Sequence, residues 1–156
     1  MNLQGVSEIC FEEVYTVPAD QTVNRLFARL PHSTHYAGTL IEALATGYLI
    51  AVIESICIRE MQRHIDPAVE TVVGTSVNLE HCAPTPAGAR LTLRGWTEQI
   101  GDRDAIFRVQ VHDEHDVVCE GTLKFVAVRR DCITRRILLK GGSRQAARED
   151  APGSAA

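Results

Sequence analysis

Glu54, His81 and Thr46 have side chains that could together perform acid–base or nucleophilic chemistry. A glutamate or a histidine transfers protons, and a carboxylate can also attack a carbonyl carbon. Glu54 lies in a long apolar segment, and its neighbours at helical spacing are Gly47, Ile50, Ala51, Cys57, Ile58 and Met61. A buried carboxylate without a cation is costly. Glu54 is therefore either paired with an arginine, in contact with a solvent gap, or a functional carboxylate.

His81 ends a segment whose side chains alternate between apolar and polar, as in a strand with one buried face. The residues expected on its face are Val73, Thr75, Val77 and Leu79. His81 is then either a hydrogen-bonded core residue or a proton carrier facing Glu54. Because adjacent strand residues point to opposite faces, we do not expect Cys82 and His81 to form a nucleophile pair.

Thr46 precedes Gly47 in the same apolar segment, where its hydroxyl either bonds back to the helix or lies beside a ligand. Thr46 and Glu54 are eight residues apart, about 12 Å along an unbroken helix. They are too far apart to touch directly, but they could flank one ligand.

The order of elements needed to position these residues is readable from hydrophobic periodicity. The pattern predicts a strand over 9–17, a short helix over 19–30, a long and nearly all-apolar helix over 39–64, and four strands over 70–80, 89–99, 105–111 and 117–128. Short turns make the last strands antiparallel neighbours, and the long helix is the element large enough to cover their sheet.

An antiparallel sheet wrapped around one long helix is the hotdog arrangement, an α+β fold, although an α+β sandwich of another topology has a similar pattern. We expect this domain over 1–130 and a C-terminal extension over 131–156. The extension has no large apolar residue from Gly141 onward, so we expect disorder from about there. The free sheet edge predicts a homodimer, which could pair further into a tetramer.

Composition excludes several classes of protein. The chain has 156 residues, 45% of them apolar, and a net charge of −4, which indicates one globular domain and no general attraction for nucleic acid. The apolar stretch 40–58 is interrupted by Glu42 and Glu54, so we expect no membrane span, and we see no secretory signal. Five cysteines without a CxxC pair favour the cytoplasm.

Two further clusters of polar residues have simple interpretations. His112 and His115 resemble a metal pair, but they lie between two predicted strands without a third ligand, so we expect a hairpin turn and no metal. The basic residues after the last strand either form a solvated face or contact the phosphates of a nucleotide-bearing ligand: Arg129, Arg130, Arg135, Arg136 and Lys140.

Two motifs together resemble the fluoroacetyl-CoA thioesterase group of hotdog-fold proteins. They are the helix sequence TGYLIAVIE from Thr46 and the sequence VGTSVNLEHCAPTPAG from Val73, and the resemblance covers roughly residues 8 to 128. It implies a catalytic set on Thr46, Glu54 and His81, with the Gly74 backbone close to the thioester, at a dimer interface. Fluoroacetyl-specific members resemble one another in an aromatic lid just before the threonine. This chain has Tyr36-Ala37-Gly38-Thr39-Leu40 there, which speaks against fluoroacetyl selectivity.

The resulting hypothesis is hydrolysis of a small or medium acyl-CoA without a cofactor. Glu54 attacks the carbonyl or activates water, His81 passes a proton to the thiolate, and Thr46 orients the carboxylate or the substrate. The backbone near Gly47 or Gly74 stabilises the oxyanion, and Tyr36 and Leu40 contact the substrate. The alternative is a hotdog module that binds or senses acyl-CoA without hydrolysing it.

Overall fold

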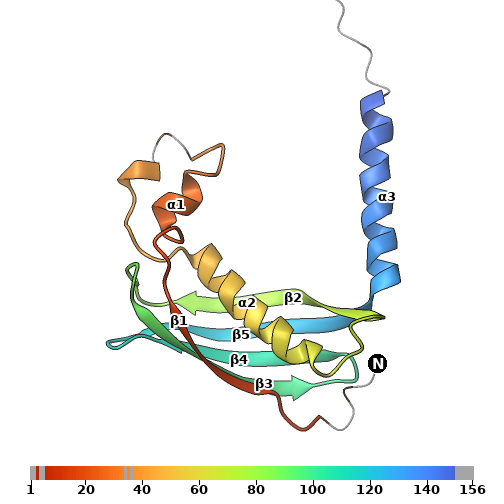
Figure 1. Ribbon diagram of the computed structural model, residues 1–156, viewed down its shortest axis with the longest axis horizontal. Helices are drawn as coiled ribbons and strands as arrows, with labels where there is room; N and C mark the ends of the chain where they lie inside the picture. The colour runs from red at the N-terminus through yellow and green to blue at the C-terminus, as the bar shows by residue number, and fades with distance from the viewer. Residues whose placement is uncertain (1–2, 4–5, 34, 36, 150–156) are drawn as a thin grey trace, which may run out of the picture.

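The computed structural model describes residues 3, 6–33, 35 and 37–149 (Figure 1). In chain order the elements are β1 (Cys10–Thr16), α1 (Val23–Phe27), a 3-10 turn (Ala37–Thr39), α2 (Thr46–Gln62), β2 (Glu70–His81), β3 (Arg90–Ile100), β4 (Asp104–His112), β5 (Val117–Arg129) and α3 (Arg130–Glu149). The four strands after α2 begin and end within two residues of their predicted limits.

The five strands form one antiparallel sheet in the order β1-β3-β4-β5-β2. Helix α2 lies across one face of this sheet (Figure 1). The predicted α+β hotdog fold is therefore confirmed. Strands β1 and β2 are the two edges of the sheet.

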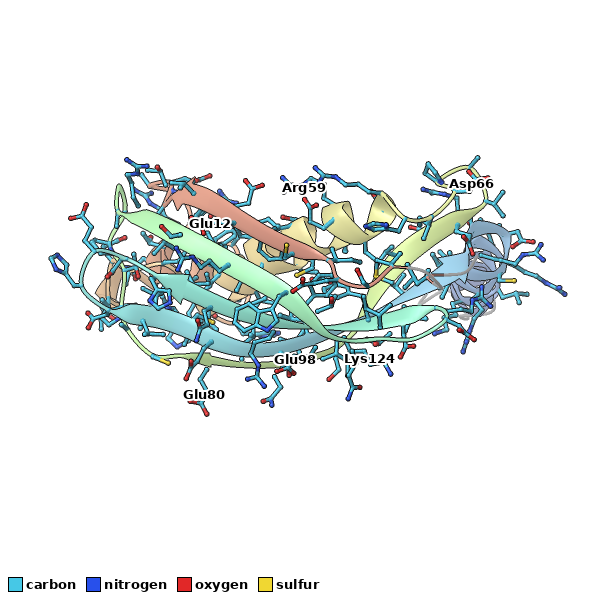
Figure 2. All side chains as sticks on the ribbon, turned by 90° about the horizontal axis from the view of Figure 1, so that it is seen from below. Glu12, Arg59, Asp66, Glu80, Glu98 and Lys124 are labelled. Carbon is cyan, nitrogen blue, oxygen red and sulfur yellow. The ribbon has the colours of Figure 1, made fainter. Side chains whose placement is uncertain are left out.

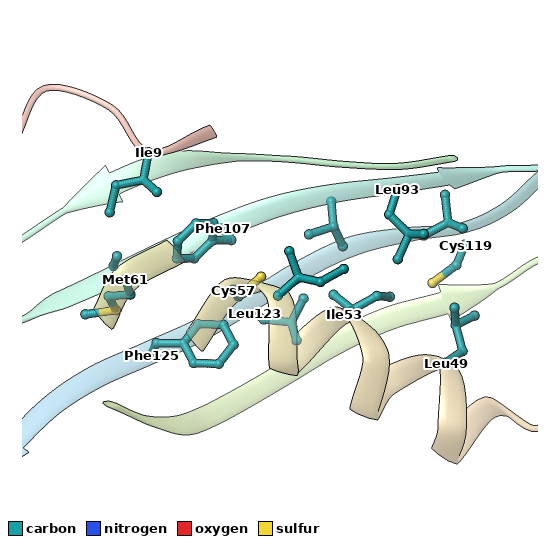
Figure 3. Close-up of a cluster of buried hydrophobic side chains, with 14 of the residues drawn as sticks. Ile9, Leu49, Ile53, Cys57, Met61, Leu93, Phe107, Cys119, Leu123 and Phe125 are labelled. Carbon is teal, nitrogen blue, oxygen red and sulfur yellow. The ribbon is translucent and has the colours of Figure 1, made fainter. Parts of the chain in front are cut away.

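The core lies between α2 and the inner face of the sheet (Figure 3). Leu49, Ile53 and Met61 are almost fully buried on one side of the helix. Met61 lies beside the buried rings of Phe107 and Phe125, which meet edge-to-face with centroids 5.8 Å apart, whereas Leu49 lies toward the other end of the helix, near Cys119 (Figure 3). On the opposite face of the sheet, the labelled side chains of Glu80, Glu98 and Lys124 point away from α2 (Figure 2). Because one face of the sheet is apolar and the other is charged, a strand residue can point only to the face that suits its side chain.

Strand β2 does not keep the strict alternation that its sequence predicts. Its register against β5 shifts between Gly74 and Ser76, so Thr75 is an extra, bulged residue. Before the bulge Val72 is buried, whereas Thr75 and Val77 are exposed. A bulge exchanges the two faces of a strand, and it is this exchange that turns His81 inward.

The predicted limits of the two helices before the sheet are too wide. Helix α2 begins at Thr46 rather than 39, and α1 covers only Val23–Phe27. The chain just before α2 is extended, because Leu44 N–H donates to Thr85 O and Ala45 N–H donates to Gln21 O. These long-range hydrogen bonds outweigh the helical periodicity of the segment.

The expectation of disorder from about residue 141 differs from the structure, in which α3 continues to Glu149. Residues 150–156 lie outside the described part of the chain. The stretch from Ser143 lacks large apolar residues but is rich in Gln, Ala, Arg and Glu, all strong helix formers. Among the described residues, no helix has the length and apolar content needed to cross a membrane.

Candidate active site

Thr46 and His81 form a hydrogen-bonded pair. Thr46 is the first residue of α2 and His81 is the last residue of β2, and both ends lie at the same side of the sheet. The Oγ1 atom of Thr46 lies 2.9 Å from Nδ1 of His81. One ring nitrogen of His81 is therefore oriented by a hydroxyl, which leaves the other nitrogen for a ligand.

The environment of His81 favours its neutral form. Burial lowers the pKa of the ring, and this exceeds the opposite effect of a hydrogen bond with the backbone of Ala83. Nε2 is buried and has no hydrogen-bond partner within the described residues. A neutral imidazole with one oriented nitrogen is suited to taking up and releasing a proton.

Glu54 lies two turns further along α2, half-buried, with its carboxylate against Gly74. A Cβ atom built on Gly74 would lie only 2.6 Å from Oε1 of Glu54. Glycine at this position therefore lets the carboxylate approach the backbone of β2. In the described part of the chain no cation pairs with Glu54. The arginines at the end of the same helix, Arg59 and Arg63, form ion pairs with the buried Glu60.

Glu54 lies at the margin of the buried stripe, not at its centre. Of its helical neighbours, Cys57 and Met61 are buried, whereas Gly47 and Ala51 are exposed. Because α2 covers the sheet with only one of its sides, its apolar sequence leaves a second side open near β2. The apolar or small neighbours of Glu54 in the sequence are therefore only partly buried in the structure.

The two parts of the site do not meet within one protomer. Thr46 pairs with His81 and Glu54 contacts Gly74, and the eight residues between Thr46 and Glu54 correspond to about 12 Å of helix. A thioester carbonyl cannot be in contact with both pairs across that distance. One protomer therefore holds the Thr46–His81 pair and the Glu54–Gly74 contact, but does not bring them together.

A cavity of about 260 Å³ opens beside the Thr46–His81 pair. Besides these two residues and Cys82 it is lined by Val23, Ile41, Ala43, Leu44, Ala83 and Pro84. These six apolar residues were missed as site residues by the sequence analysis. Ala83 and Pro84 could have been identified from the sequence, because they follow His81 closely. Val23 and Ile41 could not, because only the tertiary fold brings them to the cavity.

The other predicted substrate contacts lie elsewhere or outside the described residues. Leu40 is half-buried and exchanges two backbone hydrogen bonds with the side chain of Asn24, at 3.0 and 2.6 Å, and Ile41 rather than Leu40 lines the cavity. Gly47 is exposed in the first turn of α2, where an added Cβ would lie 3.4 Å from Cδ2 of Leu26. Tyr36 lies outside the described residues.

The remaining histidines and cysteines lie in several different environments. Among the described residues, no group of three or more His, Cys, Asp or Glu side chains could hold a metal ion. His115 belongs to the turn between β4 and β5, where its N–H donates to the carboxylate of Asp113. Burial raises the pKa of Cys57 to about 12 and that of Cys119 to about 11, so both thiols stay protonated and unreactive.

The fold and the paired residues place the chain among hotdog-fold thioesterases, and comparison with known proteins names the family. Residues 30–131 match the family described as FlK, fluoroacetyl-CoA-specific thioesterase. The fluoroacetyl-CoA thioesterase of Streptantibioticus cattleyicolor is 30% identical over 112 residues, which cover 72% of this chain and 77% of that protein. The chain therefore belongs to the fluoroacetyl-CoA-specific thioesterase family, and it is a thioester hydrolase.

Solved structures agree with this assignment. A structure of the fluoroacetyl-CoA thioesterase FlK has a TM-score of 0.75 and 26% identity, covering 84% of this chain and 93% of that one. Further structures of FlK variants hold fluoroacetate with CoA, or acetyl-CoA. A hot-dog-like protein from Thermanaerovibrio acidaminovorans, with a TM-score of 0.72, 15% identity and coverage of 90% and 97%, shares the fold.

Proposed function

We propose that this protein hydrolyses a small or medium acyl-CoA to the free acid and CoA, using Thr46, Glu54 and His81. The observation that carries the proposal is the Thr46–His81 pair at the edge of an apolar cavity, with Glu54 on the same helix. The six apolar lining residues favour a hydrocarbon acyl group, which gains binding energy from burial. Family membership supports the thioester as the reacting group.

In the proposed reaction the carboxylate of Glu54 removes a proton from water, whose oxygen bonds to the thioester carbonyl carbon. The C–S bond then breaks. Nε2 of His81 takes the proton that Glu54 removed from water and delivers it to the thiolate sulfur, so both side chains return to their starting protonation states. Thr46 holds Nδ1 and so sets the orientation of the ring. Direct attack by Glu54, giving an anhydride that water hydrolyses, uses the same residues.

The developing oxyanion requires N–H donors. Gly47 lies in the first turn of α2, where backbone N–H groups lack intrahelical partners and the helix dipole favours negative charge. The Gly74 backbone, beside Glu54, is the second candidate donor.

The site is completed, in this proposal, by a second copy of the chain. Residues Gly74–Asn78 of the edge strand β2 are exposed, as is the adjoining side of α2 at Gly47 and Ala51. Antiparallel pairing of two β2 edges, centred between Val77 and Asn78, sets His81 opposite Gly74 of the partner subunit. The carboxylate of Glu54 of the partner subunit then lies beside the Thr46–His81 pair, so each homodimer has two sites.

We place the dimer in the cytoplasm, because all five cysteines are free.

A charge on the interface edge tests this arrangement. Val77 is 46% exposed on β2, and Val14 is 55% exposed on β1, the opposite edge. A lysine on an edge strand opposes strand pairing, so Val77→Lys should give a monomer without thioesterase activity, while Val14→Lys should remain an active dimer. Sedimentation velocity with thiol release measures both properties. An active Val77→Lys monomer would show that one protomer suffices.

A further inference from the structure

Helix α3 stands apart from the rest of the domain. It continues directly from the end of β5 and rises away from the sheet, on the same side as α2 (Figure 1). The family match ends at residue 131, so the helix lies beyond the shared domain. Ile137 and Leu138 are 65% and 68% exposed on it. Because short helices gain most of their stability from packing, these side chains indicate a surface that covers α3.

The position of a second copy follows from the proposed pairing of the β2 edges. The two-fold axis of an antiparallel edge pairing is perpendicular to the sheet, so it exchanges the two ends of the strands and keeps the helices on one side. In one protomer α1 and α3 rise at opposite ends of the sheet (Figure 1). In the dimer, α3 of the partner subunit therefore rises at the end where this chain has α1 and its apolar cavity.

The strand register gives the distance between the partner's α3 and the apolar cavity. With pairing centred between Val77 and Asn78, His81 at the end of β2 is opposite Gly74 of the partner subunit, four residues from the partner's Glu70. Glu70 pairs with Arg129 in the β2–β5 ladder, and α3 begins at the next residue. The base of the partner's α3 is then roughly 17 Å from His81 at the cavity, from two strand spacings across and four residue rises along.

The two surfaces that meet there are complementary in chemistry. The cavity wall presents Ile41, which is 74% exposed, and α3 presents Ile137 and Leu138. Beyond its first turn, helix α3 also has exposed cations at Arg135, Arg136 and Lys140. The CoA part of an acyl-CoA carries phosphate groups, which bind arginine in charge-assisted hydrogen bonds.

We propose that α3 of the partner subunit covers the mouth of the acyl cavity, with its apolar residues on Ile41 and its cations on the CoA phosphates. This inference rests on the proposed dimeric thioesterase. Each active site then combines three segments from two chains: the Thr46–His81 pair, the partner's carboxylate, and the partner's C-terminal helix.

Two native cysteines allow a direct test of the placement. Cys82 lines the cavity and Cys132 lies in the first turn of α3, and both are exposed. In the dimer Cys82 lies roughly 14 Å from the base of the partner's α3, from two strand spacings across and three residue rises along. A bismaleimide spanning about 15 Å should therefore link the chains into covalent dimers. Cys82→Ser and Cys132→Ser should each abolish the product.

The cross-link separates this inference from the proposed chemistry, because it should also form in Glu54→Gln, which lacks the carboxylate. A cross-linked dimer that persists in either serine variant, products larger than dimers, or no product at all would overturn the placement of α3. Peptide mass spectrometry of the linked pair identifies the two cysteines.

Kinetics test the proposed contact with CoA. The double variant Arg135→Gln/Arg136→Gln should raise KM for acyl-CoA about tenfold more than KM for the same acyl group on N-acetylcysteamine, which has no phosphate. Arg94→Gln is the matched control, since Arg94 is an exposed arginine on β3 that pairs with Glu12, far from the β2 edge. Equal changes in KM for both substrates would overturn the assignment of phosphate binding to α3.

Discussion

The hydroxyl of Thr46 lies 2.9 Å from Nδ1 of His81, and so joins the first residue of the central helix to the last residue of an edge strand. The sequence resemblance implies that both residues belong to one catalytic set but does not say which member contacts which. The structure pairs Thr46 with His81 and brings Glu54 against Gly74 instead. In the proposed mechanism Thr46 therefore orients the ring of His81, not the carboxylate of Glu54.

Replacement of Thr46 tests this role. Thr46→Val keeps the shape of the side chain but removes the hydroxyl, so the ring of His81 loses its orienting partner, and we expect kcat to fall about 10²-fold. Thr46→Ser restores the hydroxyl and should keep most of the activity. Steady-state thiol release measures both variants. Activity kept in Thr46→Val but lost in Thr46→Ser would show that the methyl group, not the hydroxyl, matters.

Gly74 should be required for the position of the Glu54 carboxylate. A methyl group in Gly74→Ala would meet Oε1 of Glu54 at 2.6 Å, so the carboxylate must move, and we expect kcat to fall by about tenfold or more. Gly38→Ala is the control, because no atom lies within 4 Å of the added carbon. Thermal unfolding of both variants separates displacement from loss of fold. A fully active Gly74→Ala would contradict a catalytic position for Glu54.

The titration of His81 gives a prediction for pH. Because burial lowers its pKa, the ring should still be neutral at its ordinary pKa of about 6.5, and activity should decline only at lower pH. The unfolded chain binds this proton first, so the free energy of unfolding should decrease as pH falls from about 6.5 to the folded-state pKa. NMR titration, assigned with His81→Gln, measures the ring directly. A ring pKa at or above 6.5 would contradict the described burial.

Alanine substitutions at two glycines with positive φ should distinguish the stability cost of backbone strain from that of steric overlap. Gly88→Ala at φ +84° has free space around the added carbon, so we expect a loss of about 1 kcal/mol from strain alone. Gly121→Ala at φ +146° places the carbon 2.1 Å from Asn78 O in the β2–β5 ladder, and we expect a loss of about 3 kcal/mol or more. Chemical denaturation measures both. Equal losses of unfolding free energy in the two variants would mean that β2 and β5 move apart at Gly121 to make room for the methyl group.

Most of the fold was predictable because strand alternation and turn residues are local properties of the sequence. The strands from Glu70 to Arg129 follow that pattern closely. The bulge at Thr75 was not predictable, because it is set by the register between β2 and β5. The start of α2 at Thr46 likewise depends on hydrogen bonds to Thr85 and Gln21, residues distant in sequence.

The site residues were identifiable from their types, while their contacts were not. Spacing on a helix already separates Thr46 from Glu54 by about 12 Å. Which strand residue faces each of them depends on how α2 crosses β2. The apolar wall at Val23 and Ile41 depends on the path of the chain before α2, which periodicity assigned to a helix.

Thiol release by the parent and by Glu54→Gln tests the central claim most directly. The substrates should be acyl-CoAs of increasing chain length, together with fluoroacetyl-CoA. Glutamine keeps the shape of the side chain but cannot accept a proton or attack, so kcat should fall about 10²- to 10⁴-fold while thermal unfolding stays unchanged. The parent should release CoA. Binding of acyl-CoA by the parent without release, or equal release by both proteins, would contradict hydrolysis through Glu54.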